Sequence, residues 1–233
     1  MSNTPHLLEL VRKKYGSHQV DLVKPSLKSV SWKLAQAEFH IKESKKVLND
    51  ALPNEVDLVG MLRIAGWFGE QDKEKFQLAG FAAEAHLIAF AQSLHSVTDI
   101  AAQVIIHALN LNNTSKLSDE SGIKKVKCHF TKEQLYPELL DAIKNLLSSQ
   151  EFLYLEAYVN TTKHRTLIGN TFKLNLETTN EQQYGIEISN FSFKGNNFPL
   201  KRADDFTGEI YVQISDGIRN VGSVLNETVQ SIP

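Results

Sequence analysis

Two sets of polar residues stand at helical spacing in otherwise apolar parts of the sequence. Steps of three and four residues place the first polar stripe on one face of a helix, and its members are Gln92, His95, Asp99, Gln103 and His107. The second polar stripe has steps of four and consists of Glu156, Asn160 and His164. An unpaired buried polar group costs about 1–3 kcal/mol, so each stripe needs either hydrogen-bonding partners or a function.

The chemistry that these residue types suggest centres on His164. An imidazole can act as a general base near neutral pH, and Asn160 lies one turn earlier on the same helix face. Lys163 and Arg165 flank the histidine and can neutralise a phosphate. The Asn-Thr-Thr run at 160–162 places three poor helix formers in a strong helix, which indicates a requirement other than stability.

Three interpretations of the stripes remain open. In an antiparallel bundle the two stripes can face each other, which predicts that His95 and Asp99 lie near Asn160 and His164. The same residues are equally compatible with interhelical hydrogen bonds that fix helix register, or with solvated faces. A metal site is the third interpretation, with nitrogen and oxygen ligands from His95, Asp99, Glu156 and His164.

The sequence lacks the usual signals of metal and phosphate chemistry. Bundle di-metal proteins carry Glu-x-x-His pairs, whereas Glu38 and His40, like Glu84 and His86, are only two positions apart. No glycine-rich phosphate loop or nucleophile elbow occurs, and the single cysteine, Cys128, excludes an internal disulfide. We therefore expect no metal ion and no cofactor.

Composition bounds the remaining possibilities. The chain has 233 residues, of which 42% are hydrophobic, and a net charge of −2, so RNA binding requires a local basic patch. The most apolar segment, 78–111, is interrupted by charged and histidine side chains, and the N-terminus lacks the apolar region of a signal peptide. These features predict a cytoplasmic protein without a membrane-spanning helix.

Hydrophobic periodicity predicts a mostly α-helical single domain over 1–233. A short helix and a connector broken at Gly16 and Pro25 are expected before the long helices, and a lysine- and serine-rich loop is expected at 112–130. Ser148 and Glu151 resemble a capping box, and a turn is expected at 131–136. The long helices are predicted at 26–52, 72–111, 137–147, 148–167 and 205–230.

Between the last two helices the period changes from helical to alternating. Alternation around Phe172 and Ile186 predicts an antiparallel β-hairpin at about 170–194, with a bulge near Asn190 and a loop after it. The predicted fold is thus an up-and-down helical bundle with a small hairpin inserted before the C-terminal helix.

Two segments resemble the HEPN superfamily, specifically one of its uncharacterised bacterial branches. They are EFLYLEAYVNTTKHRTLI at 151–168, and FAAEAHLIAFAQSLHSVTDIAAQVI at 81–105, whose polar positions are Glu84, His95, Ser96 and Asp99. The resemblance implies a bundle of four or more helices that dimerises, and in active members cleaves RNA without a metal ion. His164 would be the motif histidine and Asn160 its polar helper.

The resemblance has one departure. Active members carry an arginine four to six residues before the motif histidine, and 158–160 contains none. Two functional hypotheses follow. The first is a homodimeric RNA-binding protein or metal-independent endoribonuclease that uses His164, Asn160, Lys163 and Arg165. The second is a non-catalytic helical bundle that binds a protein partner or a small ligand.

Overall fold

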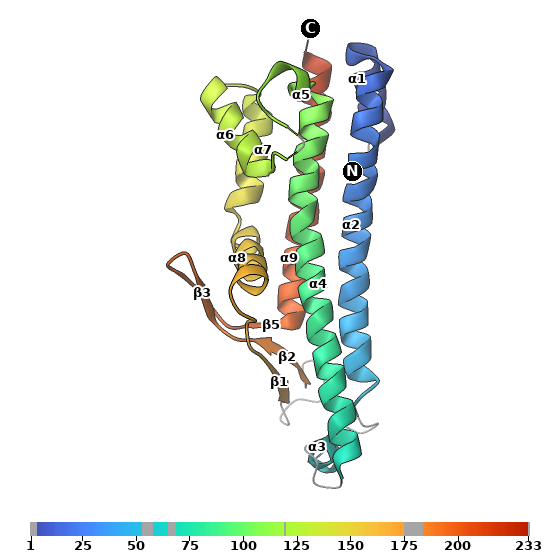
Figure 1. Ribbon diagram of the computed structural model, residues 1–233, viewed down its shortest axis with the longest axis vertical. Helices are drawn as coiled ribbons and strands as arrows, with labels where there is room; N and C mark the ends of the chain where they lie inside the picture. The colour runs from blue at the N-terminus through green and yellow to red at the C-terminus, as the bar shows by residue number, and fades with distance from the viewer. Residues whose placement is uncertain (1–3, 53–57, 65–68, 119, 175–183, 233) are drawn as a thin grey trace. The chain divides into compact units, whose positions relative to one another are not determined.

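A computed structural model describes residues 4–52, 58–64, 69–118, 120–174 and 184–232, and within them the chain is mostly helical, as predicted (Figure 1). The helices are α1 (Thr4–Tyr15), α2 (Ser17–Asn49), α3 (Leu58–Ile64), α4 (Glu70–Ala108), α5 (Leu111–Thr114), α6 (Ile123–Glu133), α7 (Pro137–Ser148), α8 (Gln150–His164) and α9 (Ala203–Ser231). The strands are β1 (Asn170–Leu174), β2 (Tyr184–Ile188), β3 (Phe191–Phe193), β4 (Asn196–Phe198) and β5 (Lys201–Arg202).

Contacts divide the chain into two compact units, each of which is described by itself. The first unit contains Met1–Gln36, Ser93–Glu156 and Ile210–Pro233, and the second contains Ala37–Gln92 and Ala157–Glu209. Helices α2, α4, α8 and α9 each contribute residues to both units. The prediction of a single domain over 1–233 stays a prediction.

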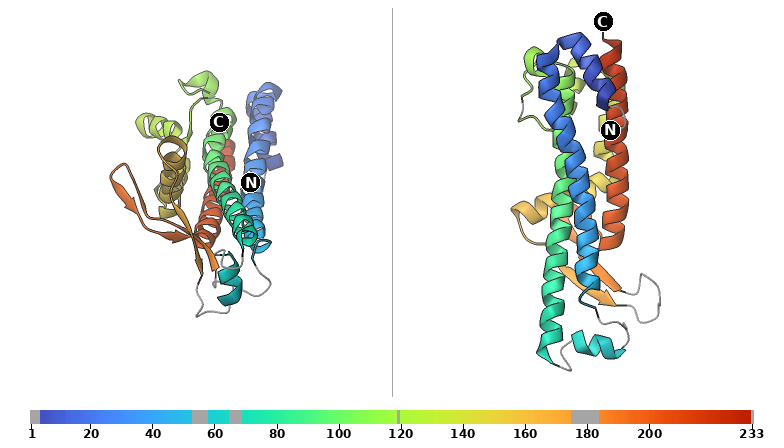
Figure 2. Two further views of the ribbon diagram at one scale, coloured as in Figure 1. Left: turned by 60° about the horizontal axis from the view of Figure 1, so that its bottom comes forward. Right: turned by 90° about the vertical axis from the view of Figure 1, so that its right-hand side faces the viewer.

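The core of the first unit is helical. The part of α9 in this unit buries a stripe at helical spacing, namely Ile210, Ile214, Ile218, Val221, Leu225 and Val229. Gly217 lies against α7, where a Cβ atom would come within 2.6 Å of Leu146 Cδ1. On α2 the buried Gln19 donates hydrogen bonds from Nε2 to the His107 carbonyl at 2.7 Å and to Asn112 Oδ1 at 2.8 Å. Figure 2 shows these long helices from two further directions.

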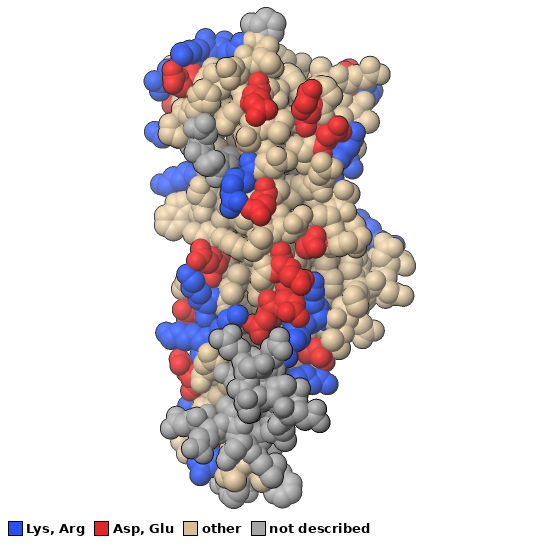
Figure 3. Space-filling view, turned by 180° about the vertical axis from the view of Figure 1, so that it is seen from behind, with Lys and Arg blue, Asp and Glu red and all other residues tan. Residues whose placement is uncertain are grey.

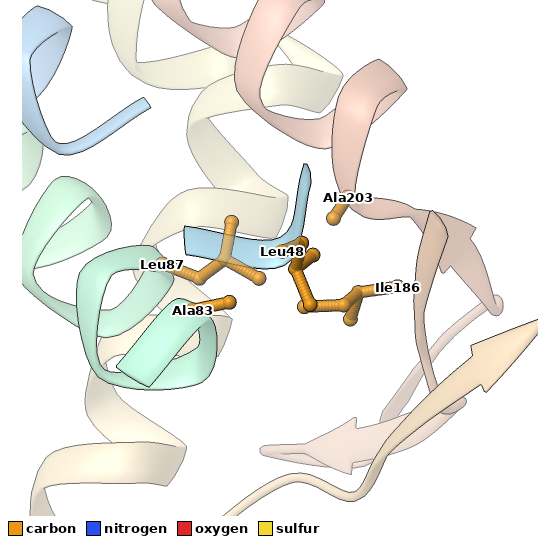
Figure 4. Close-up of a cluster of buried hydrophobic side chains, with 5 residues drawn as sticks. All are labelled: Leu48, Ala83, Leu87, Ile186 and Ala203. Atoms are coloured by element: carbon orange, nitrogen blue, oxygen red, sulfur yellow. The ribbon is translucent and has the colours of Figure 1, made fainter. Parts of the chain in front are cut away.

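In the second unit, helices pack against a small sheet. A buried hydrophobic cluster joins the end of α2, the middle of α4, β2 and the start of α9, and consists of Leu48, Ala83, Leu87, Ile186 and Ala203 (Figure 4). The buried Ser44 hydroxyl donates a hydrogen bond to the Ala83 carbonyl at 3.1 Å and so fixes α2 against α4. Phe206 on α9 packs against Phe90 and Tyr158, with ring centroids 5.7 and 5.0 Å apart.

The β region contains two small sheets instead of one hairpin. Strands β1 and β2 pair antiparallel as predicted, in a register that places Phe172 opposite Ile186, but β5 adds a third strand in the order β1-β2-β5. Strands β3 and β4 form a separate hairpin whose turn, Lys194-Gly195, has two positive φ angles of 51° and 82°. The predicted bulge near Asn190 is therefore wrong, because the register shifts where the chain passes from one sheet to the next. The predicted turn of the first hairpin, TTNEQQ at 178–183, lies outside the described residues.

Several predicted helix boundaries also need correction. The predicted loop 112–130 contains α5 and most of α6, in which Ile123, Val126 and Phe130 are buried at helical spacing while lysines occupy the exposed face. The lysines gave this segment the composition of a loop and made its short apolar repeat difficult to recognise. Helix α6 continues to Glu133 and so includes half of the predicted turn at 131–136. Helix α9 begins at Ala203, two residues earlier than predicted.

Two further boundaries differ from the prediction. Pro25 lies inside α2 instead of breaking it, and the Ser29 hydroxyl donates to its carbonyl at 2.9 Å. The cap of α8 is Ser149, one residue after the predicted Ser148, because the Phe152 N–H donates to Ser149 Oγ at 3.2 Å. Within the described ranges, no helix combines the length and apolarity that crossing a bilayer requires.

Candidate functional site

The residues that the sequence singles out are divided between the two units. His95, Asp99 and Glu156 belong to the first unit, whereas Asn160, Lys163, His164 and Arg165 belong to the second. The predicted proximity of His95 or Asp99 to Asn160 or His164 therefore spans both units and stays a prediction.

In the first unit, three polar stripe residues hold the N-terminal turn of α6. Gln103 Nε2 donates a hydrogen bond to the Ser121 carbonyl at 2.9 Å, and Lys124 on α6 donates to the Glu156 carboxylate. Asp99 lies against Gly122, the residue that precedes α6, where a Cβ atom would be 2.5 Å from Oδ1. A carboxylate at a helix N-terminus is also favoured by the helix dipole. These contacts give Asp99, Gln103 and Glu156 a structural role.

His95 occupies a different environment in the same unit. Its half-buried ring is stacked on Phe152 of α8, with centroids 6.2 Å apart and planes 16° apart. Phe152 is buried, so this contact joins α4 to α8 through an aromatic pair. The half-buried side chain of His95 thus packs against the buried core of the first unit through Phe152.

In the second unit, three consecutive side chains are exposed where α8 ends, namely Lys163 and His164 of the helix and Arg165 directly after it. The two threonines before them have structural contacts. Thr161 is buried, and the Thr162 hydroxyl donates a hydrogen bond to the Tyr158 carbonyl at 2.9 Å. The unusual Asn-Thr-Thr run is therefore partly explained by packing and backbone bonding, and its remaining feature is the exposed basic end that follows it.

The β3–β4 hairpin adds an aromatic ring and a further cation to this end. The Arg165 guanidinium carbon lies 5.0 Å from the centroid of the Phe193 ring, and Lys194 Nζ lies 5.1 Å from the same centroid. Both distances are those of cation–π interactions. We call Lys163, His164, Arg165, Phe193 and Lys194 the basic cluster.

The charges of the basic cluster are not neutralised locally. Among the described residues, no carboxylate lies within ion-pair distance of Lys163, His164, Arg165 or Lys194, whereas many other lysines of the chain are paired. The dipole of α8 favours cations in its last turn, which accounts for part of the cluster. It does not account for Lys194 and Phe193, which come from a hairpin about 30 residues later in the chain.

No comparable cluster of metal ligands is present in the described ranges. There, no three or more His, Cys, Asp or Glu side chains lie close enough together to hold a metal ion, and Cys128 is an exposed free thiol. Phe193 and Lys194 were not predicted as site residues, although the alternating Phe191-Ser192-Phe193 followed by Lys-Gly is a signal for a strand and turn with an outward basic residue.

The second unit also contains a cavity of about 610 Å³ that sequence reasoning did not anticipate. Its apolar wall includes Leu48, Leu87 and Ile186 of the hydrophobic cluster. At its charged side Asp204 pairs with Lys45 at 3.0 Å and lies 3.7 Å from Arg202. A cavity with an apolar wall and a few charged groups has the general character of a small-molecule site.

Comparison of the chain with models of known protein families, with curated proteins and with solved structures gave no match. The resemblance to the HEPN superfamily therefore rests on the two sequence segments alone.

Proposed function

We propose that this chain binds single-stranded RNA through the basic cluster and, as a HEPN-like homodimer, cleaves it without a metal ion. The observation that carries the proposal is the placement of Arg165 and Lys194 about the Phe193 ring, beside the exposed Lys163 and His164. Exposed cations near an aromatic ring match the chemistry of single-stranded nucleic acid, whose phosphates bind cations and whose bases stack.

The binding surface is local. On the face shown in Figure 3, basic and acidic side chains are mixed, so no broad positive surface covers that face. The net charge of −2 agrees with this distribution. Affinity for RNA would come from the few unpaired cations of the basic cluster and would fall steeply as salt is added.

Cleavage would use His164 as the general base. Its imidazole takes the proton of a ribose 2′-hydroxyl, the 2′ oxygen attacks the adjacent phosphorus, and the 5′ oxygen leaves with a proton from solvent. The products are a 2′,3′-cyclic phosphate and a 5′-hydroxyl. Asn160, one turn earlier, would orient the histidine, and Lys163 and Arg165 would neutralise the charge that develops on the phosphate. Arg165 and Lys194 would take the place of the arginine that HEPN enzymes carry before the histidine.

Binding is tested by fluorescence anisotropy with a labelled single-stranded RNA over a range of salt concentrations. Arg165→Gln with Lys194→Gln should weaken binding at least tenfold. It should also reduce the slope of log affinity against log salt by about 1.4, because two phosphate contacts are lost. Lys132→Gln, an exposed lysine of α6 outside the basic cluster, is the control and should bind as wild type. Equal affinity in all three proteins would refute the RNA interface.

Cleavage is tested separately, with RNA and a metal chelator present. His164→Ala should abolish the formation of cyclic-phosphate ends while RNA binding persists. His18→Ala, an exposed histidine on α2, should cleave as wild type. Binding without any cleavage by the wild-type protein would leave an RNA-binding protein and refute the endoribonuclease.

A second candidate function, favoured by the cavity of the second unit, is a non-catalytic bundle that binds a small ligand. A metabolite library screened by thermal shift tests this function. Ile41→Trp would narrow the cavity from the α2 side, where Ile41 is half-buried, and should remove any shift that the wild type shows. A ligand that shifts both proteins equally binds elsewhere, which would contradict this second function.

A further inference from the structure

Two histidines from different helices point the same ring nitrogen at each other. In the second unit, His40 Nδ1 on α2 and His86 Nδ1 on α4 are 3.0 Å apart, and their ring centroids are 5.3 Å apart. Both side chains are half-buried. The hydrogen bond from Ser44 to the Ala83 carbonyl lies one turn after His40 on α2 and one turn before His86 on α4, and it holds the two helices in this register.

The separation of the two nitrogens fits a shared metal ion. Histidine nitrogens bind late transition metals at about 2.0–2.1 Å, so two nitrogens 3.0 Å apart subtend about 94° at a common ion. That angle is close to the 90° between neighbouring ligands in square-planar or octahedral geometry. Tetrahedral geometry would need the nitrogens about 3.3 Å apart.

We propose that His40 and His86 form a two-histidine site for a divalent late transition-metal ion, with Cu²⁺ or Ni²⁺ preferred over Zn²⁺. Imidazole nitrogens suit these ions, and Cu²⁺ binds most strongly in the series. No third His, Cys, Asp or Glu completes the site among the described residues, so water fills the other positions. The ion cross-links α2 to α4, and this role is independent of RNA binding.

Phe39 supports the arrangement of the two rings. Its ring packs edge-on against His40 and His86, with centroid distances of 5.3 and 6.4 Å. Such a contact restricts the rotation of both imidazoles, and restricted ligands lose less entropy when an ion binds. In the absence of an ion the two rings form one hydrogen bond, in which one Nδ1 donates and the other accepts.

The test uses the full-length protein after treatment with chelator and dialysis. Calorimetric titration with Cu²⁺ and with Ni²⁺ should show one site per chain and a raised melting temperature, whereas Mg²⁺ should do neither. His40→Gln and His86→Gln should each weaken binding at least tenfold. His18→Gln, an exposed histidine on the same helix, should bind as wild type. His40→Asn and His86→Asn provide a second pair, in case one substitution disturbs the fold.

Electron paramagnetic resonance of the Cu²⁺ complex gives a result that does not depend on the stability of the variants. The wild-type spectrum should show coupling to two imidazole nitrogens, and either single variant should show one fewer. A wild-type spectrum without two coupled nitrogens would overturn the proposal. Undiminished binding in both single variants would overturn it as well, and would leave the pair as an interhelical hydrogen bond.

Discussion

The carboxylate of Asp99 lies against Gly122, the residue directly before α6, so closely that a Cβ atom at position 122 would be 2.5 Å from Oδ1. Gly122 has a φ of −75°, so its backbone does not require glycine and the limit is the space beside Asp99. Asp99 and Gly122 are therefore packed so closely that each residue limits what can stand at the other position.

The contact between Asp99 and Gly122 predicts that the effect of Gly122→Ala on the free energy of unfolding changes sign when Asp99 is also replaced. Gly122→Ala should lower the free energy of unfolding by about 1 kcal/mol, because Asp99 must move away from the helix terminus. In an Asp99→Ala background the same change should be neutral or stabilising, since alanine loses less backbone entropy than glycine. Urea denaturation of the four proteins measures both effects. Equal effects of Gly122→Ala in the two backgrounds would show that the residues are not coupled.

Two glycines of α9 should respond in opposite directions to replacement by alanine. Gly217→Ala should destabilise the protein by about 1–3 kcal/mol, because the new methyl group would meet Leu146 Cδ1 at 2.6 Å. Gly208→Ala should stabilise it by about 0.5–1 kcal/mol, because nothing lies within 4 Å and alanine favours the helix. Denaturant midpoints test both. Stabilisation by Gly217→Ala would show that α9 and α7 do not pack as described.

The start of α8 depends on one of two adjacent serines. Ser149→Ala should cost about 1 kcal/mol, because the Phe152 N–H loses the oxygen that accepts its hydrogen bond. Ser148→Ala removes an exposed hydroxyl that bonds to the Asn145 carbonyl, and should change the free energy of unfolding by less than about 0.5 kcal/mol. Chemical denaturation of both variants makes the comparison. A larger effect at Ser148 would restore the capping box predicted from the sequence.

Alkaline pH should destabilise the first unit through Tyr154. Burial raises the pKa of this phenol to about 12, from about 10 in the unfolded chain. Between pH 10 and 12 the folded state keeps the Tyr154 proton, whereas the unfolded state loses it. The contribution of Tyr154 to the free energy of unfolding is therefore complete below pH 10 and is lost as the pH rises towards 12. The loss is on the order of 2–3 kcal/mol. Tyr154→Phe should show a smaller decline in melting temperature between pH 9 and 11, and an equal decline would assign the effect to other groups.

His164 should matter for activity and little for stability. The side chain is exposed at the end of α8, so His164→Ala should change the free energy of unfolding by less than about 1 kcal/mol. The same variant should lose the RNA cleavage described above. Thermal melting and the cleavage assay on one preparation compare the two quantities. A melting temperature many degrees lower would indicate a structural histidine.

The sequence alone predicted most of the helices, because a long repeat of apolar residues at helical spacing marks the buried face of a helix. The apolar residues from Ile214 to Val229 recur in the sequence at steps of three and four, and the structure buries them. Helix α6 was not predicted, because it has few apolar positions and its lysines resemble those of a solvated loop. Strands β4 and β5 were not predicted, because the formation of short edge strands depends on their neighbours more than on their own residues.

The residue types of the candidate sites were visible in the sequence, but their neighbours were not. Chain order alone places Lys163, His164 and Arg165 together, at the last two residues of α8 and the first residue after it. The approach of Phe193 and Lys194 to Arg165, and of His40 to His86, joins segments about 30 and 46 positions apart. Such contacts depend on how helices and strands pack, which no local pattern encodes, and tertiary structure alone decided them.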